Sequence, residues 1–109
     1  MQRINTLLEH ELGAILQREV EFPAGCFVTV KRVKTARDLH HAAVWLSVLP
    51  VTYRDEVLRC LEESHGHIQR ELGVRIQLRF IPKLVYKLDT AEERAERINT
   101  LIDTISGGS

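Results

Sequence analysis

Apolar residues recur at helical spacing at the start of the chain. They lie three or four residues apart and would form one buried stripe, which predicts a helix from about residue 2 to residue 20. A second helical stretch follows Pro50, and a last one follows the capping-box pair Thr90 and Glu93. We expect the tripeptide Ser64-His65-Gly66 to kink and interrupt the second stretch, with Gly66 at a place where no side chain fits.

Elsewhere the pattern changes to that of strands. Cys26–Lys34 and His40–Leu49 are predicted as a hairpin, since only a short turn separates them. The second strand is apolar on both faces from Ala42 to Leu46, which favours the middle of a sheet. A third strand is predicted over Val74–Leu88, because its even positions are apolar apart from one proline.

The odd positions of the third predicted strand are largely basic, and no Asp or Glu lies within it. A regular strand would turn its four cations to one face: Arg75, Arg79, Lys83 and Lys87. The first hairpin adds four more: Lys31, Arg32, Lys34 and Arg37. A cationic face of this kind is suited to phosphate, so we predict that these residues bind RNA. The alternative is a set of ordinary solvated side chains.

Trp45 is the only tryptophan of the chain. Alternation along the second strand turns it to the same open side as Arg79 and Lys83. There its ring could stack on a base or against an Arg side chain. The alternative is that it fills the sheet surface beneath the last helix.

The composition indicates one soluble domain. With 109 residues, 44% of them hydrophobic, the chain can bury a core, and we expect one domain over residues 1–105 and a flexible end at 106–109. The charges sum to zero, so they matter only through where they lie, with acid in the helical stretches and base in the strands. Cys26 and Cys60 have no paired spacing, which favours reduced thiols and a cytoplasmic protein. The absence of a long apolar run or a signal-peptide pattern predicts no membrane partner.

Catalytic and metal chemistry find little support in the residues. His65 and His67, with Cys60 nearby, lack a fourth ligand at a suitable spacing, so no metal and no other cofactor is expected. The serines and cysteines have no His and acid arranged around them that the sequence reveals. We therefore predict no catalytic residue and no enzymatic activity.

The order of the elements predicts how the strands pair. The second and third strands are joined by a helical crossover, so they should be parallel, and the first strand should pair antiparallel on the other side. This is an α+β fold with a three-stranded mixed sheet and helices mainly on one face, the arrangement of a single type II KH-like domain. Three segments resemble the signature segments of the ribosome-binding factor A family: Ala36–Val44, Gly66–Gly73 and Leu78–Leu84.

The chain departs from the family pattern at a few positions. Ser64 stands where the family has the Ala of an Ala-x-Gly kink, and Ala43 and Lys83 stand where a Lys and a Glu are expected. The G-x-x-G loop of ordinary KH domains, which lets a sugar-phosphate backbone approach, is also absent, because no second glycine lies three residues after Gly66.

The resemblance implies a non-enzymatic assembly factor that binds the small ribosomal subunit and its rRNA and assists late maturation, including that of the rRNA 5′ end. It also implies a role in adaptation to cold and other assembly factors, such as a GTPase, as partners. We expect a monomer. A second hypothesis stays open, in which the chain is a KH-like protein-docking module that uses its acidic helices and makes no direct contact with RNA.

Overall fold

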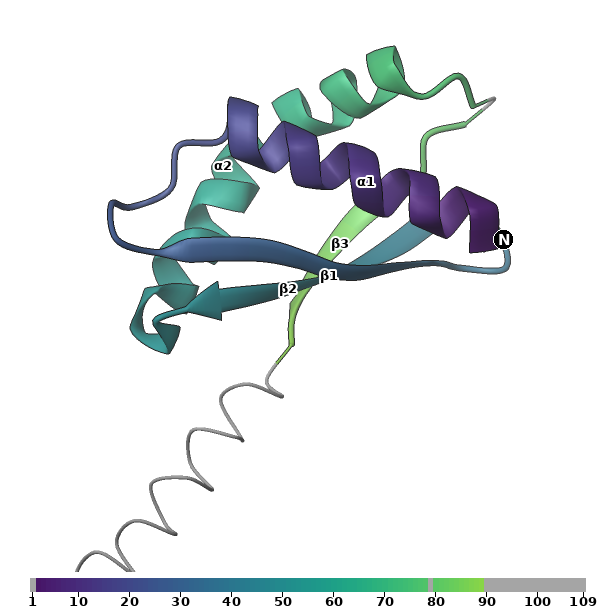
Figure 1. Ribbon diagram of the computed structural model, residues 1–109. Helices are drawn as coiled ribbons and strands as arrows, with labels where there is room; N and C mark the ends of the chain where they lie inside the picture. Colours follow the sequence, from purple (N-terminus) through teal and green to yellow (C-terminus); the bar gives the residue numbers. More distant parts are fainter. Residues whose placement is uncertain (1, 79, 90–109) are drawn as a thin grey trace, which may run out of the picture.

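The computed structural model describes residues 2–78 and 80–89. Its elements are α1 Gln2–Glu19, β1 Phe27–Thr35, β2 His41–Leu49, the 3-10 turn η1 Val51–Tyr53, α2 Arg54–Arg75 and β3 Lys83–Leu88. Both helices lie on one face of the sheet (Figure 1). The last helix and the flexible end that the sequence predicts lie outside the described residues.

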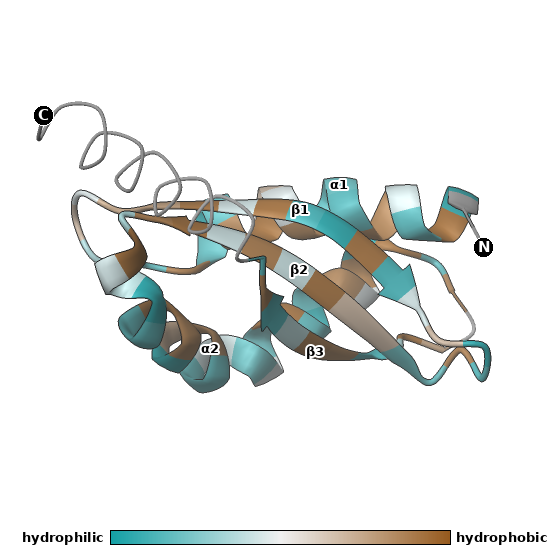
Figure 2. Ribbon diagram, turned by 90° about the horizontal axis from the view of Figure 1, so that it is seen from below, coloured by the Kyte–Doolittle hydropathy of each residue, from teal (hydrophilic) through white to brown (hydrophobic). Residues whose placement is uncertain are grey.

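The strands form one sheet in the order β1-β2-β3. β1 and β2 pair antiparallel as a hairpin, and β2 and β3 pair parallel through the crossover that contains α2. The predicted α+β fold, strand order and pairing are therefore confirmed. Figure 2 looks onto the face of the sheet turned away from α1 and α2, which we call the outer face.

The core lies between the two helices and the inner face of the sheet. Its largest fully buried side chains come from three elements: Leu8, Leu12 and Ile15 of α1, Val44 and Leu46 of β2, and Val57, Leu61, Ile68 and Leu72 of α2. Burial of each such side chain contributes about 1.5–3 kcal/mol. Because Val44 and Leu46 point inward, the alternating residues of β2 point to the outer face.

The third strand is shorter than predicted. α2 continues to Arg75, β3 begins only at Lys83, and the residues described between them are neither helix nor strand. The helix extends this far because Leu72 and Ile76 are buried in the core and the Ile76 N–H donates to the Leu72 carbonyl. Val74, which the alternation would turn inward, is 78% exposed. The prediction of a strand before Lys83 was therefore wrong.

The predicted interruption of the second helix is not found. α2 runs as one helix of 22 residues through Ser64-His65-Gly66, although its ribbon changes direction along its length (Figure 1). Leu61 and Ile68 are buried on either side of the tripeptide, and their burial outweighs the ~1 kcal/mol that a glycine costs in a helix. A Cβ atom at Gly66 would meet nothing within 4 Å, so the prediction that no side chain fits there was also wrong.

Candidate nucleic-acid interface

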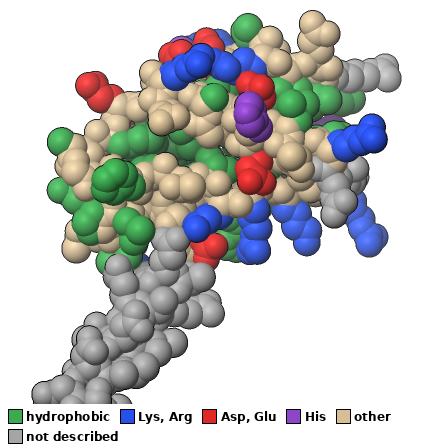
Figure 3. All heavy atoms as spheres, viewed as in Figure 1, with side chains coloured by type: hydrophobic (Ala, Val, Ile, Leu, Met, Phe, Trp, Pro, Cys, Tyr) green, Lys and Arg blue, Asp and Glu red, His purple; other side chains and the backbone are tan. Residues whose placement is uncertain are grey.

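Basic side chains gather on the outer face of the sheet. Within the described part of the chain, the three strands contain no Asp or Glu, and their Lys and Arg residues are all exposed: Lys31, Arg32 and Lys34 in β1, and Lys83 and Lys87 in β3. Figure 3 shows Lys and Arg side chains projecting from the side of the molecule opposite the helices. Arg37, in the hairpin turn, is exposed as well. A face of this charge attracts polyanions.

A β-bulge places two consecutive cations of β1 at the surface. Arg32 lies opposite Trp45 and Val30 lies opposite the next residue of β2, so Lys31 is an extra residue between the two pairs. The sequence carries a signal of this bulge. After Val30 the next inward residue of β1, Val33, comes three positions later instead of two.

Trp45 lies between two cations of the outer face. It is opposite Arg32 of β1 and Lys87 of β3, so the three residues form a row across the sheet. The Arg32 guanidinium carbon lies 4.7 Å from the centre of the Trp45 ring and the Lys87 Nζ lies 5.3 Å from it, within the range of cation–π attraction. The ring stays partly exposed. The stacking of Trp45 on a base stays a prediction.

Beside this row the outer face is hollowed. The hollow has a volume of about 630 Å³ and includes Trp45 and Lys87 at one end. Ala43 and Val85, which lie opposite each other in β2 and β3, give it an apolar part, and Lys34 lines it from β1. Because the Ala43 side chain is only a methyl group, it leaves space above the sheet at this point.

The hairpin turn at the edge of the hollow is stabilised by the side chain of Asp38. Asp38 Oδ1 accepts a hydrogen bond of 2.8 Å from the His40 N–H, and Asp38 Oδ2 lies 3.6 Å from His41 Nδ1. The backbone hydrogen bond holds the pKa of Asp38 below its usual value, so the carboxylate is ionised at neutral pH. The turn that carries Arg37 is thereby stabilised locally.

Comparison with known proteins gives the family. The family model described as ribosome-binding factor A matches residues 1–102. The chain belongs to the ribosome-binding factor A family. The ribosome-binding factor A of Natranaerobius thermophilus is 38% identical to it over 108 residues, which cover 98% of this chain and 82% of that protein.

Two structures of ribosome-binding factor A from Thermus thermophilus have the same fold. The crystal structure has a TM-score of 0.71 at 18% identity, covering 83% of this chain and 96% of that chain. A homology model fitted into a cryo-EM map of a 30S–RbfA complex has a TM-score of 0.68 at 21% identity, covering 79% of this chain and 91% of that chain. The two structures support the fold, and the match of the family model over residues 1–102 confirms the family membership that three segments of the sequence indicate.

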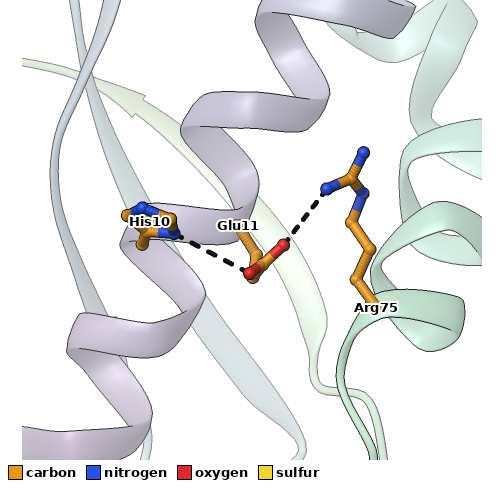
Figure 4. Close-up of polar contacts among 3 residues, drawn as sticks. All are labelled: His10, Glu11 and Arg75. Carbon is orange, nitrogen blue, oxygen red and sulfur yellow. Dashed lines mark hydrogen bonds and ion pairs between the residues drawn. The ribbon is translucent and has the colours of Figure 1, made fainter.

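Arg75 does not belong to the cationic outer face. It lies at the end of α2, where its Nη1 is 3.3 Å from Glu11 Oε2 of α1, and Glu11 Oε1 is 3.7 Å from His10 Nδ1 (Figure 4). The extension of α2 explains the difference, because a helical Arg75 is on the side of the sheet that carries α1. The pair ties α2 to α1. Arg79 lies outside the described residues, so its role stays a prediction.

His65 of the predicted kink and the nearby His67 make structural contacts. His65 Nδ1 is 3.1 Å from the Tyr86 hydroxyl of β3, and burial raises the pKa of Tyr86 to about 12, so the phenol is neutral. His67 Nε2 is 2.9 Å from Glu19 Oε2 of α1. The two histidines thus contact different elements. Within residues 2–78 and 80–89, no group of three or more His, Cys, Asp or Glu could hold a metal ion.

Five residues of the hollow were not predicted by the sequence analysis as members of a site: Thr35, Ala36, His41, Ala43 and Val85. No pattern within a single strand could have found them, because the hollow exists only where β1, β2, β3 and the hairpin turn come together. Of the helices in the described part of the chain, none is both long and apolar enough to cross a membrane.

Proposed function

We propose that the chain is a non-enzymatic assembly factor that binds the small ribosomal subunit and its rRNA through the outer face of its sheet. Its membership of the ribosome-binding factor A family supports this proposal. The Thermus thermophilus relative fitted into a map of a 30S–RbfA complex supports it further. The proposal includes assistance in late maturation at the rRNA 5′ end and in the cold. It also includes action as a cytoplasmic monomer alongside other assembly factors, such as a GTPase.

The observation that carries this proposal is the array of cations on the outer face. Neighbouring strands lie ~4.8 Å apart, so Arg32 and Lys87, two strands apart, are separated by roughly 10 Å at the backbone. Lys83 and Lys87 are separated by about 13 Å along β3. The cations therefore spread over an area, as is suited to contacts with several phosphates of a folded RNA.

Removal of two outer-face cations tests the proposal. We expect Arg32→Ala with Lys83→Ala to weaken binding to purified small subunits and to reduce the slope of log affinity against log salt by ~0.7–0.9 for each lost phosphate contact. The matched control is Arg59→Ala with Arg70→Ala, which removes two exposed cations from α2. The measurement is the affinity for small subunits over a series of salt concentrations.

Affinity and salt slope equal to those of the wild type in the Arg32 and Lys83 variant would refute the outer face as the binding surface. A larger loss in the α2 control would place the contact with the small subunit on α2 instead. The maturation role has a separate test. In cells that lack the native factor, the wild-type chain should restore mature rRNA 5′ ends and growth in the cold, and the outer-face variant should do so less well.

A further inference from the structure

The hollow on the outer face has an apolar and a basic lining. A simple phosphate-binding surface needs only the basic one. One part is apolar and includes Ala43, Val85 and the Trp45 ring. The other part is basic and consists of Lys34, Arg37 and Lys87. An apolar floor beside cations suits a ligand that has a flat apolar part and an attached anion.

The size of the hollow limits the ligand. Its volume of about 630 Å³ lies within the ~300–1000 Å³ range of sites for small molecules and cofactors. A base with its sugar and phosphate is a ligand of this class. A paired duplex would present only phosphates and base edges to a shallow surface, because its bases are stacked on one another.

The geometry of Trp45 decides how a base would lie. Arg32 and Lys87 approach the ring from the strands on either side, at 4.7 Å and 5.3 Å from its centre. The two cations therefore lie against the Trp45 ring. The apolar surface that a base could contact is that of Ala43 and Val85, together with the part of Trp45 that faces them.

We propose that this hollow holds one unpaired nucleotide of a single-stranded RNA segment, with its base against Ala43 and Val85 and its phosphates at Lys34, Arg37 and Lys87. The proposal rests on the proposed function and deepens it by naming a single-stranded segment of rRNA as the ligand of the outer face. Trp45 closes one end of the site and holds Lys87 in place through the cation–π contact.

A variant that fills the hollow without changing any charge tests this proposal. Ala43→Leu places a larger side chain on the floor, and Ala43→Val does so with less bulk. Thr29→Leu is the matched control, because Thr29 is an exposed residue of β1 opposite Ser47 and does not line the hollow. Thermal melts would first establish that each variant folds.

The probe is a short oligouridylate, with an RNA duplex of matched length as the second ligand. We expect Ala43→Leu to weaken oligouridylate binding by about tenfold, the range of one lost base contact, with the salt slope unchanged. Binding of the duplex should not change, and Thr29→Leu should bind both probes as the wild type does. Since Trp45 is the only tryptophan, its fluorescence should respond to oligouridylate in the wild type and less in Ala43→Leu.

Equal oligouridylate affinities for Ala43→Leu, Ala43→Val and the Thr29 control would overturn the proposal. An equal loss of duplex binding in Ala43→Leu would overturn it as well, because a general effect on the face would then explain the result. Either result can occur while the Arg32 and Lys83 variant still loses small-subunit binding, in which case the nucleotide site fails and the proposed function stands. If the wild type does not bind small subunits at all, the proposed function fails.

Discussion

At the scale of single residues, two glycines of this chain have opposite structural roles. Gly66 lies on the exposed side of α2 with free space where a Cβ would lie, whereas Gly25 has a φ of +86°, in the region that L side chains rarely adopt. We expect Gly66→Ala to raise the free energy of unfolding by up to ~1 kcal/mol, because alanine is the better helix former. Denaturant unfolding followed by circular dichroism measures it.

Gly25→Ala is the comparison for this prediction. We expect it to lower the free energy of unfolding by roughly 1–2 kcal/mol, because its backbone must stay left-handed. A loss of stability in Gly66→Ala of the same size would mean that the change of direction of α2 depends on that glycine after all. The sequence alone could not place Gly66 inside a continuous helix, because a glycine is also the residue that most often follows a helix end.

At the scale of elements, a side chain of α2 completes the start of β3. Gln69 Oε1 accepts a 2.9 Å hydrogen bond from the Leu84 N–H, and Gln69 Nε2 donates to the Pro82 carbonyl at 3.3 Å. We expect Gln69→Ala to cost about 1–3 kcal/mol, because it removes the partner of the Leu84 amide. Amide hydrogen exchange at Leu84 should accelerate in this variant.

A neutral change on the same helix checks this assignment. Glu62→Ala, at an exposed position of α2, should change stability by no more than a few tenths of a kcal/mol and leave exchange at Leu84 as it is. Unchanged exchange in Gln69→Ala would show that another group or water replaces the amide. Contacts of this kind join residues 15 positions apart in the chain, so the periodicity of one segment does not reveal them.

At the scale of the whole molecule, the charges sum to zero but are unevenly placed. The strands hold base without acid, whereas α1 and α2 hold acid and base together. We expect the wild type to bind heparin at neutral pH in spite of its zero net charge, because a polyanion responds to the local field of the outer face. The measurement is the salt concentration at which the protein elutes from a heparin column.

Two variants with the same net charge separate position from total charge. Arg32→Ala with Lys83→Ala should elute at lower salt, and Arg59→Ala with Arg70→Ala should elute close to the wild type. Equal shifts in both would mean that heparin responds to net charge alone. That result would remove the main physical support for a directed interface on the sheet.

The sequence by itself determined the parts of this protein that depend on local periodicity and chain order. The first helix and the first two strands begin and end within one residue of their predicted bounds, because their apolar stripes face the core as the pattern requires. The parallel pairing of β2 and β3 follows from the length of the crossover, and the family follows from three short segments.

Only the tertiary structure decided where α2 ends and which residues of separate strands lie side by side. The alternation before Lys83 resembles a strand, but burial of Leu72 and Ile76 extends α2 and carries Arg75 to Glu11. The bulge at Lys31, the row of Arg32, Trp45 and Lys87, and the hollow at Ala43 arise where separate strands meet. The physical reason is that a helix end and a binding surface depend on contacts between distant segments, whereas a stripe depends on neighbours in the chain.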